Sequence, residues 1–170
     1  MVPPGRAWAP EPVRAVAIDL GQARIGVALC DSGGTVATPY ETIERSGDEA
    51  SDHERLSALA SEAGAVVVVV GWPVSLDGTE GPAAVAARAE AGRMAGLVGL
   101  PVVMHDERLT TVTAERALRH AGSRRRRRRG VVDQVAAAVL LQSWLDGGGP
   151  GRVAAERVAP REATDGAAGR

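Results

Sequence analysis

The sequence predicts one α/β domain, built on a mixed sheet with an antiparallel start and helices on both faces. Two observations predict this class. Three β-type segments crowd the first third of the chain, and farther along strand-like runs alternate with helical patterns. The predicted order is β-β-β-α-β-α-β-α-α. At 170 residues the chain has room for a single domain with its own core.

The first third of the chain is expected to form a hairpin followed by an edge strand. Residues 1–13 are rich in proline and are expected to be a disordered lead. Residues 14–20 (RAVAIDL) and 24–30 (RIGVALC) are predicted strands joined by a tight, glycine-containing turn. Residues 36–43 are a third predicted strand, and Pro39 places it near an edge because proline cannot donate to a ladder.

The middle of the chain is expected to alternate helix and strand. Residues 48–63 carry one apolar stripe at helical spacing. Residues 65–70 (AVVVVV) form an unbroken apolar run between glycines, which is typical of a strand covered on both faces. A loop over residues 72–79 then leads to a second helix over 82–98, which begins with a proline. Residues 101–105 form a short predicted strand.

The last third of the chain is expected to be helical and then disordered. Residues 110–120 are a predicted helix, 122–130 a loop that contains six consecutive arginines, and 131–146 the last helix. Residues 147–170 turn to glycine, alanine, arginine and proline, so we expect a disordered tail. The folded domain is therefore expected at residues 14–146.

The charge of the chain is unevenly distributed. The net charge is −1, which taken alone argues against a nucleic-acid partner. Residues 13–104 hold 6 arginines against 12 acidic residues, a net of −6, whereas residues 105–146 hold 9 arginines against 5, a net of +4. A local basic region matters more for phosphate binding than the charge of the whole chain.

Cysteine content and hydropathy indicate a cytoplasmic protein. Cys30 is the single cysteine, so no internal disulfide can form and a structural zinc site is disfavoured. The proline-rich start lacks the apolar core of a signal peptide. No apolar run approaches the roughly 20 residues of a membrane span, so no membrane partner is expected.

Three acidic residues are candidates for catalysis and metal binding. Asp19 ends the first predicted strand, Glu107 follows the last one, and Asp133 lies in the first turn of the last predicted helix. Such positions gather at one edge of an open sheet. Converging carboxylates repel one another unless a cation lies between them, and Mg²⁺ or Mn²⁺ with oxygen ligands can drive phosphodiester hydrolysis. An acid in a first helical turn is also typical of a helix cap, so each position taken alone leaves both roles open.

Arginines near these acids are candidates for contact with nucleic acid. A run of like charges is usually a solvated loop, but arginine binds phosphate in a bidentate manner, and this run lies just before Asp133. Arg24 and Arg108 each follow a candidate carboxylate, where they either steer phosphate or balance the acids. The candidates for nucleic-acid contact are Arg24, Arg108, Arg124, Arg125, Arg126, Arg127, Arg128 and Arg129.

Other side chains leave two interpretations open. His105 could be a base, but its place in an alternating strand favours a packed histidine. Trp72, in a predicted loop, could stack on a base or cap the core. His53 is expected on a helix surface.

Four segments of the chain resemble the motifs of the YqgF family, also called RuvX. They are residues 19–28 (DLGQARIGVA), 71–82 (GWPVSLDGTEGP), 106–111 (DERLTT) and 132–142 (VDQVAAAVLLQ). They occur in the family's order over roughly residues 14–146. The family often has an aromatic residue where His105 stands and a mixed Lys/Arg basic loop, and the tail has no counterpart.

The resemblance implies an RNase H-like fold and a bacterial, cytoplasmic, divalent-metal nuclease. It implies that Asp19, Glu107 and Asp133 fill the three acidic positions. The family is described as a nuclease of pre-16S rRNA in ribosome maturation, and an older interpretation made it a Holliday junction resolvase. The implied partner is structured nucleic acid, with pre-16S rRNA favoured over a four-way DNA junction, and the ribosome is a further candidate. A junction cutter would form a homodimer, whereas an rRNA nuclease can be a monomer.

Two other classes compete with this interpretation. An actin-like ATPase or sugar kinase shares an Asp-x-Gly turn that handles phosphate through Mg²⁺, but it needs a second such domain. A non-catalytic module that binds nucleic acid or the ribosome would need no acids, and here all three are present.

Overall fold

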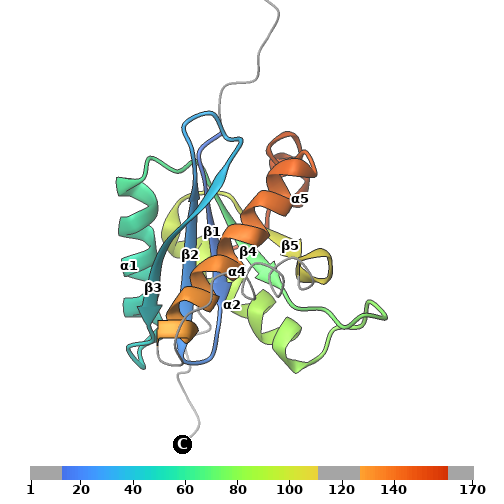
Figure 1. The fold of residues 1–170 in the computed structure, drawn as a ribbon. Helices are drawn as coiled ribbons and strands as arrows, with labels where there is room; N and C mark the ends of the chain where they lie inside the picture. Colours follow the sequence, from blue (N-terminus) through green and yellow to red (C-terminus); the bar gives the residue numbers. More distant parts are fainter. Residues whose placement is uncertain (1–12, 111–126, 161–170) are drawn as a thin grey trace, which may run out of the picture.

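A five-stranded mixed sheet forms the centre of the molecule in the computed structural model, which describes residues 13–110 and 127–160 (Figure 1). The strand order is β3-β2-β1-β4-β5. β1 pairs antiparallel with β2, and β2 with β3, whereas β4 runs parallel to β1 and β5 parallel to β4. The predicted mixed sheet with an antiparallel start is confirmed. The strands are β1 (Ala15–Leu20), β2 (Arg24–Cys30), β3 (Ala37–Glu44), β4 (Val67–Trp72) and β5 (Val102–Asp106).

The first three strands follow the sequence prediction closely. β1 and β2 form the expected hairpin, with Asp19 opposite Gly26. β3 pairs with β2 alone and so lies at an edge of the sheet, as Pro39 predicted. Its register with β2 shifts between Val27 and Ala28.

β4 lies at the predicted place but two residues later than expected. Ala65 N donates to Ala60 O, so the first residue of the apolar run completes the exit from the preceding helix. At the other end the strand continues through Gly71 and Trp72, which pair with His105 and Asp106 of β5. The loop prediction for Trp72 is therefore wrong. A glycine in a strand interior can mark a close approach of another group rather than a strand end.

Helices cover both faces of the sheet, as predicted. α1 (Glu49–Glu62) and α2 (Pro82–Val98) pack on one face, and α4 (Arg127–Asp146) crosses the other (Figure 1). Asp48 caps α1 by accepting from Ala50 N and Ser51 N. Leu56 and Met94 are among the buried side chains of the first layer, and Leu141 and Trp144 are among those of the second.

The last helix begins earlier than predicted. The described part of α4 begins at Arg127, so the arginines at 127–129 are helical and not part of a loop. Asp133 lies six residues beyond Arg127 and so is not a first-turn residue, and the interpretation of this acid as a helix cap is wrong. The predicted helix over 110–120, beyond Thr110, and Arg124, Arg125 and Arg126 lie outside the described residues.

The predicted tail is folded as far as residue 160. After α4 the chain forms two short helices, η2 (Gly149–Arg152) and α5 (Val153–Glu156), and Val158 N donates to Val102 O on β5. A side chain at Gly149 would place its Cβ 2.2 Å from the Trp144 indole, so this glycine permits close packing where composition suggested disorder. Residues 1–12 and 161–170 lie outside the described part of the chain.

Among residues 13–110 and 127–160, no helix is long and apolar enough to cross a membrane.

Candidate active site

Asp19 lies near the carboxyl end of β1, where the parallel strands of the sheet meet one edge. It is the fifth of the six residues of β1 and is half-buried. The residues before it, from Ala15 to Ile18, are buried, which fixes the strand and therefore the place of this carboxylate. The turn to β2 follows directly.

A glycine on β2 lets α4 bring Asp133 to this edge. Gly26 pairs with Asp19 across the hairpin. A Cβ built on Gly26 would lie 2.1 Å from the backbone oxygen of Asp133, so the helix can cross here only because no side chain is present. Asp133, which the sequence placed at the start of a helix, therefore lies further along α4.

A second glycine, on β4, makes room for Glu107. This residue begins a short helix, η1 (Glu107–Leu109), directly after β5. A Cβ built on Gly71 would lie 2.1 Å from Glu107 Oε1, so the carboxylate rests on the bare backbone of β4. β4 is the neighbour of β1 in the sheet, so Glu107 lies one strand away from Asp19.

The pKa values of the three acids are all raised, chiefly by burial. Burial, followed by the charge of Asp133, raises the pKa of Asp19 from 3.8 to about 6. Burial, followed by the charges of Asp19 and Asp106, raises the pKa of Glu107 from 4.5 to about 7. Burial and Glu44 also raise the pKa of Asp133, although Arg24 opposes them. Asp19 is therefore coupled electrostatically to both other acids.

The donor set of this edge suits a hard cation. Carboxylate oxygens are the ligands that Mg²⁺ and Mn²⁺ prefer, and a cation would offset the repulsion that raises these pKa values. Within residues 13–110 and 127–160, however, no three His, Cys, Asp or Glu side chains lie close enough together to hold a metal ion. Asp19, Glu107 and Asp133 therefore fit such an ion by the chemistry of their oxygen ligands and not by a ready-made cluster.

The two arginines beside the acids are both paired with acidic groups. Arg24 Nε lies 2.8 Å from Glu44 Oε1, and its Nη1 lies 4.0 Å from Asp133 Oδ2. Arg108 Nε donates to Asp106 Oδ2 at 2.8 Å. Both arginines therefore balance local charge in this structure, and their contact with phosphate stays a prediction.

Three further residues that the sequence singled out have defined contacts. His105 Nε2 lies 2.9 Å from Ser143 Oγ, and burial with the charge of Arg152 lowers the pKa of His105. Trp72 Nε1 donates to Glu80 Oε1 at 3.1 Å. The surface prediction for His53 is wrong, since this side chain is 1% exposed. The sequence held the signal, because His53 precedes Leu56 by three residues and Ala60 by seven, on the apolar stripe.

The fold and the acidic edge define the class of protein, an RNase H-like domain. The solved structure of RuvC from Thermus thermophilus in complex with a Holliday junction substrate shares this fold. It superposes with a TM-score of 0.52 at 16% identity, over 81% of this chain and 96% of that chain.

The chain belongs to the RuvX family, whose model, described as Holliday junction resolvase, matches residues 13–147. A protein of Kineococcus radiotolerans is 46% identical over 145 residues, covering 82% of this chain and 77% of its own length. One of Rhodococcus erythropolis is 50% identical over 137 residues, covering 78% and 77%. Both carry the name "Putative pre-16S rRNA nuclease". Family and relatives place the chain among the nucleases.

Proposed function

We propose that this protein is a divalent-metal-dependent endonuclease that processes the 5′ end of pre-16S rRNA during ribosome biogenesis. One observation carries the proposal: Asp19, near the carboxyl end of β1, lies beside Gly26, over which α4 passes at Asp133, and one strand away from Gly71, on which Glu107 rests. The names of the relatives supply the substrate.

Asp19, Glu107 and Asp133 would together hold Mg²⁺ or Mn²⁺ through carboxylate oxygens. When bound, such an ion supplies an activated water and charge stabilisation for the leaving oxygen of a phosphodiester. The raised pKa values of Asp19 and Glu107 mean that neutral pH leaves these groups partly protonated without a cation. Metal binding would therefore release protons from the site.

The arginines of the chain would bind the RNA backbone. Arg24 and Arg108 stand beside the acids, with side chains 27% and 37% exposed, so each can donate to a phosphate oxygen while it stays near its acidic partner. The arginines at positions 124–129 would add a longer contact. Such contacts position the substrate but do not read its sequence.

A four-way DNA junction is the second candidate substrate. The description of the family model and the RuvC structure favour it. Symmetric cleavage of a junction would require two copies of the chain acting together as a homodimer. A nuclease of precursor rRNA would instead act on the assembling ribosome in the bacterial cytoplasm, as a monomer or a dimer.

A side-by-side cleavage assay tests the proposal. The protein is incubated with a 5′ fragment of pre-16S rRNA and with a four-way DNA junction, each with Mg²⁺, Mn²⁺ or EDTA. Asp19→Asn is the inactive variant, and Glu54→Gln, at an exposed acid of α1, is the matched control. We expect metal-dependent cleavage of the RNA by the wild type and Glu54→Gln only.

The other outcomes favour other functions. Symmetric cleavage of the junction alone would assign the protein to DNA. Cleavage of neither substrate, or equal cleavage by Asp19→Asn, would sink the three-carboxylate proposal and favour a module that binds nucleic acid or the ribosome.

A further inference from the structure

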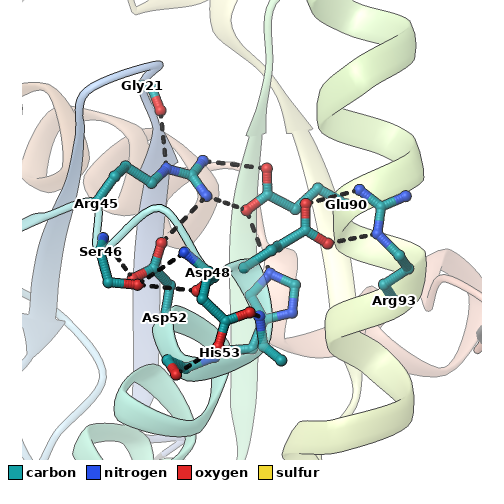
Figure 2. A network of polar contacts seen from close by, with 11 residues as sticks. Gly21, Arg45, Ser46, Asp48, Asp52, His53, Glu90 and Arg93 are labelled. Carbon is teal, nitrogen blue, oxygen red and sulfur yellow. Dashed lines mark hydrogen bonds and ion pairs between the residues drawn. The ribbon is translucent and has the colours of Figure 1, made fainter.

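The turn that follows Asp19 is held by a residue from another element. Gly21 N donates to Arg24 O at 2.9 Å and closes the turn between β1 and β2. Arg45, just after β3, contacts the turn twice. Its backbone N donates to Ala23 O at 3.0 Å. Its side-chain Nε donates to Gly21 O at 3.1 Å, as Figure 2 shows. Arg45 thus ties the turn to the rest of the fold.

Acidic side chains of two helices fix the guanidinium of Arg45. Its Nη1 and Nη2 donate to the two oxygens of Glu90 on α2, at 2.7 and 3.1 Å, and Nη1 lies 3.8 Å from Asp52 Oδ2 on α1 (Figure 2). Glu90 is 9% exposed, and its Oε1 also lies 3.2 Å from the buried His53 Nε2. A bidentate pair sets the plane of the guanidinium, so Nε is aimed at Gly21 O.

The pair between Arg45 and Glu90 is ionised on both sides near neutral pH. Burial raises the pKa of Glu90, but the hydrogen bonds from His53 and Arg45 and the charge of Arg45 outweigh burial and bring it to about 2. Arginine does not lose its proton in proteins. A change of pH near neutrality therefore does not break the connection between α2 and the turn.

The site needs such a connection because three carboxylates meet at one edge of the sheet. α4 passes over Gly26, the partner of Asp19 on β2, at Asp133, and Glu107 rests on Gly71 of β4, the strand beside β1. A yielding turn would let the end of β1 move away from the like charges. A buried ion pair is weak evidence for stability, since apolar residues often replace it without loss, so a role in fixing geometry is the better account of this one.

We propose that Arg45 is a positioning residue for the nuclease reaction: it bridges the β1–β2 turn to Glu90 and so fixes the backbone that carries Asp19. The inference rests on the proposed function in taking Asp19 as a ligand of the metal.

The test compares Arg45→Gln with two other variants of the full chain. Arg45→Lys keeps the charge but cannot donate to Gly21 O and to both Glu90 oxygens in one plane. Arg93→Gln is the matched control, since Arg93 joins the same two helices through Glu49, with Nη2 to Oε2 at 2.9 Å (Figure 2). For each variant we would measure amide hydrogen exchange at residues 20–24, the rise in Tm on adding Mg²⁺, and kcat and KM on the RNA.

We expect three effects of Arg45→Gln. Loss of a residue that orients a metal ligand typically lowers metal affinity or activity by about 10- to 100-fold, so kcat should fall by that factor and the Mg²⁺-induced rise in Tm should shrink. KM for the RNA should stay within about twofold, because substrate contacts remain. Exchange at residues 20–24 should become faster, Arg45→Lys should recover part of each effect, and Arg93→Gln should show none.

Each opposite result overturns the inference. Unchanged exchange at residues 20–24 in Arg45→Gln would do so whether or not the wild type cleaves RNA. Equal kinetic defects in Arg93→Gln, at an equal loss of Tm, would reduce the role of Arg45 to stability. If the wild type neither cleaves RNA nor responds to Mg²⁺, the proposed function fails, and the exchange measurement still decides whether Arg45 holds the turn.

Discussion

Asp19 and Glu107 have raised pKa values because the fold partly buries them beside like charges. In the unfolded chain these carboxyl groups titrate near 3.8 and 4.5, and in the folded chain near 6 and 7. A carboxyl group whose pKa is higher in the folded state binds more protons when folded. The contribution of these two acids to stability therefore falls as pH rises from about 4 to about 7. At pH 8 the metal-free site opposes folding.

Asp19→Asn should stabilise the metal-free protein at pH 8 while it abolishes metal-dependent cleavage. The substitution removes one of the repelling charges at nearly constant volume, and it also removes one of the proposed metal ligands. We expect a higher Tm than that of the wild type in EDTA, and a smaller rise in Tm on adding Mg²⁺. Thermal unfolding at pH 5 and pH 8 checks this, because the advantage over the wild type should be smaller at pH 5.

Glu54→Gln, which removes an exposed charge from α1, serves as the control for that experiment and should leave the response to Mg²⁺ unchanged. A lower Tm of Asp19→Asn in EDTA at pH 8 would contradict the account of repulsion.

Glu90 should show the opposite pH dependence. Its pKa lies below the unfolded value of 4.5, at about 2, so the unfolded chain binds more protons between these values. The stability that the ionised Glu90 contributes is present above pH 4.5 and is lost as pH falls toward 2. Glu90→Gln should lower the free energy of unfolding by about 3–5 kcal/mol at pH 7, because it leaves Arg45 without its buried partner.

Urea unfolding at pH 7, 5 and 3 would measure this difference, which should shrink at pH 3. Glu49→Gln is the control, since the pair with Arg93 is exposed and should contribute about 0–1 kcal/mol. A difference between wild type and Glu90→Gln that is constant from pH 7 to pH 3 would contradict the prediction.

At the scale of elements, two glycines admit the groups that complete the site. Gly71 in β4 lies under the carboxylate of Glu107, and Gly26 in β2 lies under the backbone of α4 at Asp133. The group that an added Cβ would strike differs between the two positions. The Glu107 carboxylate above Gly71 can rotate away, whereas the backbone of α4 above Gly26 cannot move without moving the side chains packed around it.

Alanine at these two positions should therefore separate activity from stability. Gly71→Ala should displace the Glu107 carboxylate and abolish cleavage, while Tm changes little.

Gly26→Ala should push α4 from the sheet and lower the free energy of unfolding by about 1–3 kcal/mol or more, as overpacking does. Thermal unfolding and RNA cleavage of both variants give the answer. Gly99→Ala would not serve as a control, because Gly99 has a left-handed φ of 67°. Ala86→Gly in α2 instead measures how much a single substitution within a helix changes the stability of the protein. Full activity of Gly71→Ala would show that Glu107 need not rest on β4.

The elements that the sequence predicted well are those whose pattern is local. Periodicity and a proline located the second helix at its observed bounds, and the edge strand followed from Pro39. The predictions were wrong where a contact between residues far apart in the sequence determines the local structure. Gly71 looked like a strand end because nothing local reveals a carboxylate above it, and Gly149 looked like part of a disordered tail because Trp144 is near it only in the fold.

At the scale of the whole molecule, the sequence indicated which acids to consider but not how they meet. Asp19 and Glu107 follow strands of a parallel pattern, so their common edge could be predicted. Asp133 was predicted at a helix start, and its true place depends on α4 beginning at Arg127 and crossing Gly26. The Arg45 cluster escaped prediction because Arg45 follows β3 whereas its partners belong to α1 and α2, and only the packed fold brings these residues together.

The uneven charge of the whole chain leads to a last prediction, on salt. Although the net charge is −1, arginines occupy positions 124–129 without interruption. If all six contact phosphates, replacing them by glutamine should reduce the slope of log affinity against log salt by about 4 for single-stranded RNA, at about 0.7 per contact. Binding of the RNA fragment to Asp19→Asn, which should not cleave it, would be measured from low to high salt with and without the replacements. Arg55→Gln with Arg88→Gln, at exposed arginines paired with acids, should change the slope little. An unchanged slope in the sixfold variant would mean that the basic segment faces solvent and that Arg24 and Arg108 carry the contact with the backbone.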